Sequence, residues 1–394
     1  MSRDELHTDV VLDLRDDPDG WFASLCGLRN VVRALVSLSH AGFAAATVVG
    51  DDAGRAIDLY HQHSLYRRDP ERALVATAAA VPPAPGERAV LVFRAPVVFS
   101  SLAARALAQT AEGRSDVPDD LPRGLPGFLT RASTSAERRG AAAAIRRACG
   151  KPMLQSGIAS VYLLQPMAQV FNRVLCRTSL TPNVITVLGF LVGMAALPLL
   201  WHGGTTEMII AVCLLFLNNM LDQIDGQLAR MKYLFSTYGE KLDHYLDEIT
   251  KVVILAPIGM GLFHATGYEI WMILGWAGSG ARLLYALTLA YYVENFGGTD
   301  ATTTNFRFWY RVPRDGSDSK QSAAAPSSGG IKLRYFLRKD FIHSAYFAFG
   351  VFGLLEIPFV VAAFGAIEYG VISIIQLTLF HRRVGFQRSY HGDV

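Results

Sequence analysis

The chain of 394 residues carries 37 Lys and Arg against 34 Asp and Glu, a formal net charge of +3 at pH 7. Because a nucleic-acid-binding protein needs a strongly basic surface, this small excess argues against a nucleic-acid partner. Only 18% of the residues are charged while 51% are hydrophobic, and apolar runs near membrane-spanning length are concentrated between residues 180 and 382, so an ordinary soluble protein is also excluded.

The N-terminal region, residues 1–135, has the pattern of a small cytosolic α/β domain. Buried strands are expected at 10–15, 44–51 and 88–94, and the segment between the first two has helical apolar spacing that ends at Gly42. A strand, a helix and a strand in that order predict a parallel, doubly wound sheet. The first twenty residues lack the basic and apolar parts of a signal peptide, so we expect this domain to stay in the cytoplasm. The four cysteines have neither metal-ligand nor disulfide spacing.

Residues 136–180 are predicted to connect this domain to the membrane. The sequence AERRGAAAAIRRAC (136–149) predicts a linking helix, and the apolar spacing that follows predicts a helix lying in the membrane interface. Pro166 argues against one straight helix there. Thr181 and Pro182 then have the pattern of an N-cap and a first helical position.

Residues 181–385 are predicted to form an α-helical integral membrane domain of six transmembrane helices. The expected spans are 183–202, 206–227, 248–267, 270–292, 341–363 and 366–381. The segment 295–332 between the fourth and fifth spans is rich in Gly, Ser, Thr and Ala, and its middle is predicted to be a mobile cytoplasmic loop.

The placement of Lys and Arg predicts the orientation. The loops after the first, third and fifth spans contain no Lys or Arg, whereas the segments on the other side contain many, from Arg173 before the first span to Arg388 after the sixth. Basic loops remain cytoplasmic. We therefore expect a multi-pass protein of the cytoplasmic (inner) membrane with both termini in the cytoplasm.

Four aspartates lie at the cytoplasmic edge of the second and third spans. Asp222 and Asp225 are three residues apart and Asp243 and Asp247 four apart, so each pair shares one helix face. Four carboxylates converging on one point need cations, and an all-oxygen ligand set favours Mg²⁺, Mn²⁺ or Ca²⁺ over zinc. The alternative is that they are ordinary solvated charges, which two pairs at helical spacing make a poor explanation.

The same segment matches a family signature. It reads D-x-x-D-G-x-x-A-R-x8-G-x3-D-x3-D without departure, through the residues Asp222, Asp225, Gly226, Ala229, Arg230, Gly239, Asp243 and Asp247. This pattern resembles the signature of the CDP-alcohol phosphotransferase (CDP-alcohol phosphatidyltransferase) family, and the resemblance covers about residues 150–385.

The resemblance implies transfer of a phospho-alcohol group from a CDP-alcohol to the hydroxyl of an acceptor alcohol, with release of CMP, in phospholipid or polar head-group biosynthesis. It implies that Asp222, Asp225, Asp243 and Asp247 hold two Mg²⁺ ions (Mn²⁺ is an alternative), that Asp243 and Asp247 are catalytic, and that Asp247 is the general base. It further implies that the CDP site is lined by Gly226, Ala229, Arg230 and Gly239. Beyond donor and acceptor, the implied partners are membrane lipids and a second copy in a homodimer.

The N-terminal domain resembles, more distantly, the nucleotidyltransferase domain fused to some relatives, including bifunctional inositol-phosphate cytidylyltransferases. The sequence LRDDPDGWFASLCG follows the first strand where a glycine-rich basic loop is expected, and Ala95 or a neighbour stands where a metal-binding aspartate is expected. We therefore expect an inactive domain; the alternative is an unrelated small α/β domain. The fusion favours an inositol-phosphate pathway.

Other functional readings stay open at this point. Arg282 could hold an acceptor phosphate, pair with an aspartate, or extend to the interface. Arg338, Lys339 and Asp340 could reach the aspartates or set topology, and His343 and His381 are expected to be interfacial. As a whole, the chain could instead be a cation-coupled transporter with the acidic cluster as its ion site, or a scaffold.

Overall fold

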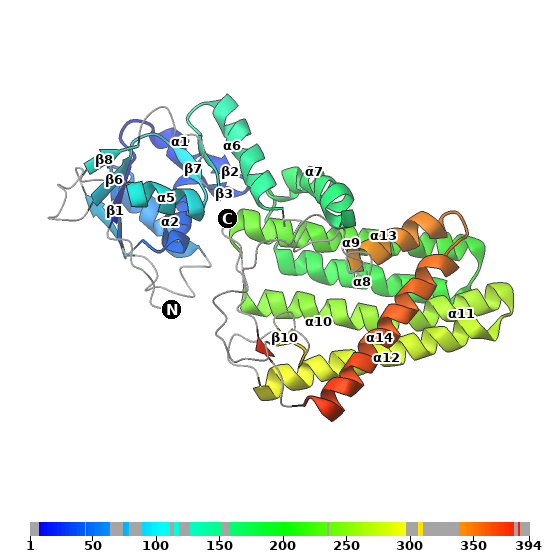
Figure 1. Cartoon of the computed structure of the whole chain (residues 1–394). Helices are drawn as coiled ribbons and strands as arrows, with labels where there is room; N and C mark the ends of the chain where they lie inside the picture. Colours follow the sequence, from blue (N-terminus) through cyan, green and yellow to red (C-terminus); the bar gives the residue numbers. More distant parts are fainter. Residues whose placement is uncertain are drawn as a thin grey trace.

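The structure is a computed structural model, and it describes residues 8–43, 45–63, 74–78, 89–110, 114–117, 127–150, 158–234, 236–296, 306–309, 339–381 and 385–386. It has a small N-terminal α/β region followed by a bundle of long apolar helices (Figure 1). Arg338 and most of the segment 295–332 lie outside the described residues, so the predictions made for them stay predictions.

The N-terminal region is built on a parallel sheet of five strands in the order β5-β4-β1-β6-β8. These strands are β1 (Thr8–Asp13), β4 (Ala45–Val49), β5 (Leu74–Ala78), β6 (Ala89–Phe93) and β8 (Arg114–Asp116). All neighbouring strands of this sheet are parallel, with Val10 opposite Ala46 on one side and Leu91 on the other. The three predicted strands and their parallel pairing are thus observed, whereas the described helices α2, α3 and α5 pack in one cluster on one face of the sheet, so the doubly wound arrangement stays a prediction.

Short helices and two small antiparallel sheets complete this region. The helices are α1 (Pro18–Phe22), α2 (Asn30–Ala41), α3 (Ala53–Gln62) and α5 (Ser101–Thr110), and the paired strands are β2 (Ser24–Leu25) with β3 (Leu28–Arg29) and β7 (Val97–Phe99) with β9 (Leu129–Arg131). Helix α2 ends where the sequence predicted, because Gly42 takes the left-handed conformation (φ 87°) that favours glycine.

The connection to the bundle consists of three helical pieces. Helix α6 (Ser135–Ala148) begins with a capping box between Thr134 and Glu137. A π-helical turn, η2 (Ser160–Leu164), leads into α7 (Gln165–Leu175), and Pro166 stands in the first turn of α7. As Pro166 indicated, the segment is not a single straight α-helix. Val170, Phe171 and Val174 of α7 are exposed, which fits an interfacial helix.

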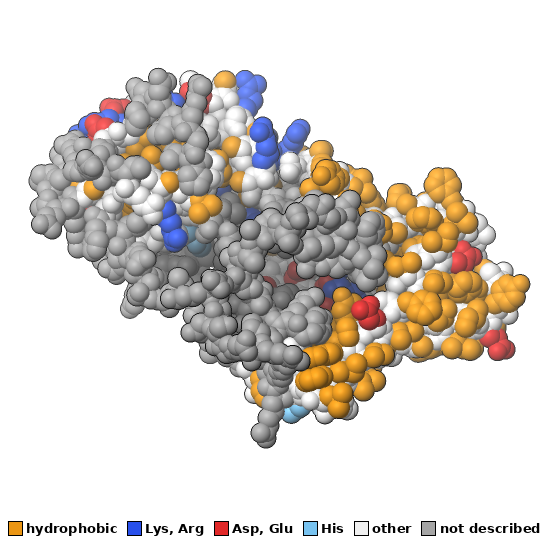
Figure 2. All heavy atoms as spheres, viewed as in Figure 1, with side chains coloured by type: hydrophobic (Ala, Val, Ile, Leu, Met, Phe, Trp, Pro, Cys, Tyr) orange, Lys and Arg blue, Asp and Glu red, His pale blue; other side chains and the backbone are white. Residues whose placement is uncertain are grey.

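In the described part of the chain the bundle consists of seven helices: α8 (Pro182–His202), α9 (Thr205–Lys232), α10 (Thr237–Val253), α11 (Leu255–Thr266), α12 (Glu269–Phe296), α13 (Lys339–Gly350) and α14 (Glu356–Leu379). Two short strands, β10 (Phe306–Arg307) and β11 (Gly385–Phe386), pair beside it. Helices α10 and α11 follow each other with a bend at Ile254, three residues before Pro257, whose ring cannot fit an unbroken helix there. Large apolar side chains cover the outside of the bundle (Figure 2).

Five helices in the described part of the chain are long and apolar enough to cross a membrane: Pro182–His202, Thr205–Lys232, Tyr238–Thr266, Glu269–Phe296 and Glu356–Leu379. The first four correspond to the first four predicted spans. Six spans are not confirmed. The predicted boundary between spans five and six was wrong, because α14 runs unbroken through residues 363–366 and the chain instead turns between Gly350 and Glu356.

Helix α13 is the shortest part of this bundle that reaches the aspartates. Its 12 residues correspond to about 18 Å, which is less than the hydrocarbon thickness of a bilayer. It starts with Lys339 beside Asp222 and ends with Gly350 against Val212, so it runs antiparallel to α9.

Close helix packing explains two glycines of α11. A Cβ on Gly261 would lie 1.9 Å from the Leu200 carbonyl oxygen of α8. A Cβ on Gly259 would lie 2.4 Å from the Trp271 carbonyl oxygen and 2.9 Å from the Gly275 Cα of α12. The backbones of α8, α11 and α12 therefore approach one another more closely than any side chain would allow.

Candidate active site

A cavity open to solvent, with about 270 Å³ of empty space when its open part is included, lies between helices α8, α9, α10 and α13. It is lined by Thr186, Gly189, Phe190, Asn218, Asp222, Asp225, Asp243, Leu246, Asp247, Thr250 and Lys339. All four aspartates singled out in the sequence thus line a single cavity.

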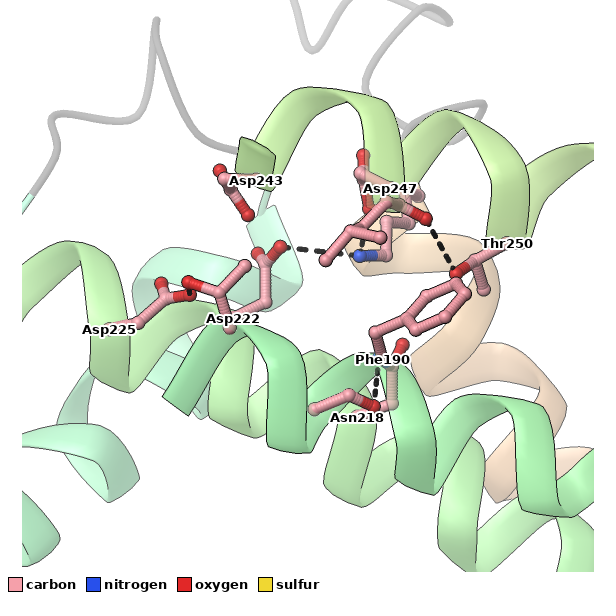
Figure 3. Close-up of a pocket in the computed structure, with 11 residues that line it drawn as sticks. Phe190, Asn218, Asp222, Asp225, Asp243, Asp247 and Thr250 are labelled. Carbon is pink, nitrogen blue, oxygen red and sulfur yellow. Dashed lines mark hydrogen bonds and ion pairs between the residues drawn. The ribbon is translucent and has the colours of Figure 1, made fainter. Parts of the chain in front are cut away.

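Two helices supply these carboxylates. Asp222 and Asp225 extend from the last third of α9, and Asp243 and Asp247 from the middle of α10, toward the space between them (Figure 3). Helices α9 and α10 both pack against α8 rather than closely against each other. Helical spacing places each pair of carboxylates on one face of its helix, and these faces border the cavity.

A lysine from α13 lies among the carboxylates. Lys339 Nζ donates to Asp222 Oδ1 at 3.3 Å and, in a shorter contact, to Asp247 Oδ1. The Lys339 side chain is only 12% exposed, against 28% for Asp222 and 18% for Asp247. Buried charges are costly unless paired, so this ammonium group compensates part of the negative charge of the cavity.

Further contacts fix the individual carboxylates. Asp225 is almost fully buried, and its Oδ2 accepts a hydrogen bond of 2.5 Å from the Thr186 hydroxyl of α8. Asp247 Oδ2 also pairs with Lys251 Nζ at 2.6 Å, one turn further along α10. Helices α8 and α9 are joined nearby, because the Asn218 amide donates to the Gly189 carbonyl at 2.8 Å. The carboxylates are therefore oriented by three neighbouring helices.

The donor set fits a hard divalent cation, although the present arrangement is not a closed metal cage. Carboxylate and hydroxyl oxygens are the ligands that Mg²⁺ and Mn²⁺ prefer. Within the described residues, no group of three or more His, Cys, Asp or Glu side chains is gathered closely enough to hold a metal ion as it stands. The Lys339 ammonium group lies between Asp222 and Asp247 and contacts both carboxylates.

The remaining residues of the signature do not line the cavity. A Cβ on Gly226 would meet only the guanidinium of Arg230, at 3.5 Å, so the helix surface is open there. A Cβ on Gly239 would lie 2.7 Å from both Asn183 Oδ1 and Ser236 Oγ, so this glycine accommodates neighbouring side chains of the chain itself. Their expected role at a CDP site stays a prediction, as does that of Ala229, which is partly buried on α9.

Arg230 and Arg282 are both held by partners outside the cavity. Arg230 Nε donates to the Cys149 carbonyl at 2.6 Å, at the end of α6. Arg282 pairs with both oxygens of Glu248, at 3.1 and 2.9 Å, and lies over the ring of Tyr285. Of the alternatives raised for Arg282, the structure shows pairing with a carboxylate, but a glutamate rather than one of the four aspartates.

Asp340, His343 and His381, also considered from the sequence, all lie outside the lining of the cavity. The Asp340 carboxylate accepts from the Ser160 backbone amide at 3.1 Å and so joins α13 to η2. His343 is buried within the bundle, contrary to the expected interfacial position. His381 Nδ1 shares a hydrogen bond of 3.1 Å with the Tyr292 hydroxyl.

Sequence reasoning missed Thr186, Glu248 and Lys251 around the site. Thr186 lies four residues after Pro182, and only the packing of α8 against α9 brings it to Asp225. Glu248 and Lys251 follow Asp247 at helical spacing, so the periodicity that found the aspartates could have included them.

The sequence that contains the four aspartates of the cavity is similar to that of a known protein family. Residues 179–308 match the family model of CDP-alcohol phosphatidyltransferase. The chain is 31% identical over 139 residues to the inner membrane protein YnjF of Escherichia coli (strain K12), which covers 34% of this chain and 65% of that protein. It is 31% identical over 97 residues to archaetidylinositol phosphate synthase of Pyrococcus horikoshii, which covers 25% of this chain and 50% of that protein.

Among solved structures, Mycobacterium tuberculosis phosphatidylinositol phosphate synthase with CDP-DAG bound matches with a TM-score of 0.34 and 17% identity, over 56% of this chain and 92% of that chain. The matched segments span less than two thirds of the length of the two curated relatives. Residues 179–308, which match the family model of CDP-alcohol phosphatidyltransferase, contain all four aspartates of the cavity.

Proposed function

We propose that this protein is an integral membrane enzyme that transfers a phospho-alcohol group from a CDP-alcohol to the hydroxyl of an acceptor. The observation that supports this most directly is the convergence of Asp222, Asp225, Asp243 and Asp247 on one cavity inside the matched family domain. A solvated acidic surface would not collect four carboxylates from two helices around one cavity.

In this proposal the four aspartates hold two divalent cations, Mg²⁺ or Mn²⁺. Cations bound there would neutralise the diphosphate of the donor and the charge that develops on the departing CMP. The acceptor oxygen forms a bond to the phosphorus that carries the donor alcohol, while the bond from that phosphorus to the CMP oxygen breaks. The hydroxyl proton passes to Asp247, whose carboxylate is held beside the cavity by Lys251 and Lys339.

We further propose that the acceptor is anionic, a phospho-alcohol such as inositol phosphate. Three cationic side chains, Lys251, Lys339 and Arg282, lie on the side of the site around Asp247 and Glu248. The name of the Pyrococcus horikoshii relative refers to an inositol phosphate product, which agrees with this choice. The donor remains a CDP-alcohol of unassigned kind.

The membrane orientation and the role of the N-terminal region are also proposals. We place the cavity and both termini on the cytoplasmic side, following the basic residues of the sequence. We propose that the N-terminal region does not transfer nucleotides. Asp13 at the end of β1 is paired with Arg15 at 2.7 Å and Arg94 at 3.5 Å, and the Arg15 side chain holds the pKa of Asp13 below its usual range.

The test is release of CMP by purified full-length protein supplied with Mg²⁺, a CDP-alcohol such as CDP-diacylglycerol, and a panel of phosphorylated and neutral polyols. We expect Asp243→Asn and chelation with EDTA to abolish release. Glu240→Gln, on the same helix but facing solvent, is the matched control and should retain it.

Several results would contradict the proposal. Unchanged turnover in Asp243→Asn would remove the assigned site. Ion flux in proteoliposomes without nucleotide affinity would favour the alternative of a cation-coupled transporter. Faster turnover with neutral polyols than with their phosphates would contradict the anionic acceptor alone.

A further inference from the structure

Helix α9 ends at its C-terminus in an unusual backbone conformation. Tyr233 takes a left-handed conformation (φ 51°), and its backbone amide donates to Arg230 O while that of Leu234 donates to Ala229 O, at 3.3 and 2.9 Å. These two bonds form the helix-ending motif in which the left-handed position is normally glycine. A tyrosine there strains the backbone, so the side chain must contribute something that offsets the strain.

The Tyr233 side chain is buried in the core of the N-terminal region. It is only 2% exposed and belongs to the same apolar cluster as the buried residues of β1, α2 and β6. Its hydroxyl lies 2.9 Å from the Ser37 hydroxyl, and the Arg33 guanidinium stands over its ring, 5.3 Å from the centroid. Arg33 and Ser37 are one turn apart on α2, so one face of α2 receives the ring.

The N-terminal region also satisfies the last carbonyls of α9. Arg33 Nη2 donates to the Met231 carbonyl at 2.6 Å, and His63 Nε2 lies 3.1 Å from the Lys232 carbonyl. With the two bonds described above, the carbonyls of residues 229–232 all have partners. A buried guanidinium at a helix C-terminus also interacts favourably with the helix dipole.

A further contact joins this end of α9 to the start of α8. Lys232 Nζ donates to the Thr178 and Leu180 carbonyls at 2.7 and 3.1 Å. We name Arg33, Ser37, His63, Lys232 and Tyr233 together the junction cluster. It holds the turn that separates Asp222 and Asp225 on α9 from Asp243 and Asp247 on α10, and Tyr233 is only eight residues, about 12 Å of helix, beyond Asp225.

We propose that the N-terminal region is a positioning element of the membrane site, and that Tyr233 is the residue through which it sets the relative register of the two aspartate pairs. This inference rests on the proposed function for its catalytic meaning, but its structural content concerns cation binding alone. An α/β region that only accompanied the membrane domain would not need to bury a residue of the helix that bears the aspartates.

The test compares Tyr233→Gly with Tyr233→Phe in the full-length, detergent-solubilised protein. Glycine relieves the backbone strain and keeps the helix-ending bonds but removes the ring, whereas phenylalanine keeps the ring. The first readout is the Mg²⁺ concentration that gives half of the Mg²⁺-induced rise in unfolding temperature. The second is the Mg²⁺ dependence and kcat of CMP release.

We expect Tyr233→Gly to raise the half-saturating Mg²⁺ concentration about tenfold, the order found when a residue that orients metal ligands is lost, and to lower kcat. Tyr233→Phe should restore most of the wild-type behaviour. Val92→Ala is the control, because Val92 is buried on the opposite face of the sheet, in a separate cluster with Val11, Val49 and Val90. It should lower the unfolding temperature without moving the Mg²⁺ midpoint.

The proposal is overturned if Tyr233→Gly behaves like Val92→Ala, or if it is more stable than the wild type with an unchanged midpoint. Should Tyr233→Gly not fold, Tyr233→Leu, which keeps part of the apolar volume, is read by the same two criteria. Absence of CMP release by the wild type, together with a shifted Mg²⁺ midpoint in Tyr233→Gly, would refute the proposed function and leave the positioning role supported.

Discussion

Lys339 offers the sharpest test of how the cavity manages its charge. Replacing it with methionine keeps most of the volume and removes the ammonium group that joins Asp222 to Asp247. Removing one partner of a fully buried pair costs about 3–5 kcal/mol. Because these aspartates are 28% and 18% exposed, solvent compensates part of that cost, and we expect about 2–3 kcal/mol for the metal-free protein.

A bound divalent cation should reverse this disadvantage. If Lys339 and the cation compete for the same carboxylates, Lys339→Met regains with bound Mg²⁺ the stability that it lost in the metal-free state. A gain of about 2–3 kcal/mol corresponds to binding that is roughly 30- to 150-fold tighter. The assay is thermal unfolding of wild type and variant over a series of Mg²⁺ concentrations, with EDTA as the zero point.

Lys251→Met is the matched control for this experiment. Lys251 also pairs with Asp247, at 2.6 Å, but from the same helix and without lining the cavity. We expect it to lower stability similarly with and without Mg²⁺. An unchanged or weaker Mg²⁺ midpoint in Lys339→Met would show that Lys339 does not stand in for a cation, and the reasoning would fail.

Three further changes test separate contacts. Thr186→Val removes the hydroxyl that donates to Asp225 and should weaken Mg²⁺ binding about tenfold at unchanged unfolding temperature in EDTA; an unchanged midpoint counts against the role of Thr186. Glu248→Gln leaves the charge of the Arg282 guanidinium poorly compensated and should cost about 2–4 kcal/mol of stability. The double variant Glu248→Leu with Arg282→Met removes both charges and should recover most of that stability. Unfolding curves measure both effects. Burial lowers the pKa of His63, so the neutral form that stabilises the fold is present above about pH 6.5 and is lost as the pH falls. Between pH 7.5 and 5.5 the unfolding temperature of His63→Gln should therefore fall less than that of the wild type. Parallel curves of unfolding temperature against pH would contradict this.

Local patterns in the sequence predicted much of the architecture. The strands around Val10, Val48 and Val92, the end of α2 at Gly42 and the first four apolar helices all follow from residue spacing, which acts over a few neighbours. The same holds for the aspartates, because i,i+3 and i,i+4 spacing decides which carboxylates share a helix face.

The error at the last two predicted spans has a different origin. The sequence FGAIE around Gly365 was interpreted as a loop, but it lies within α14, where Glu368 is exposed. One small residue of α14, Gly370, allows close packing, because a Cβ on it would lie 2.8 Å from the Ala281 Cβ of α12. The actual turn contains Gly353 with φ 73°. A small residue thus has the same appearance in a sequence whether it makes a turn or a close helix contact.

The parts of the site that the sequence could not supply are those that depend on contacts between distant segments. Lys339 is 92 residues from Asp247, and Arg33 is 198 residues from Met231. Spacing within α9 and α10 can place two carboxylates on a face, but it cannot say that the two pairs border one cavity, because that depends on how both helices pack against α8. A tyrosine where a helix end favours glycine is a local inconsistency, and such inconsistencies point to positions where tertiary contacts override local preference. Here the overriding contact connects the N-terminal region to α9, the helix that carries Asp222 and Asp225.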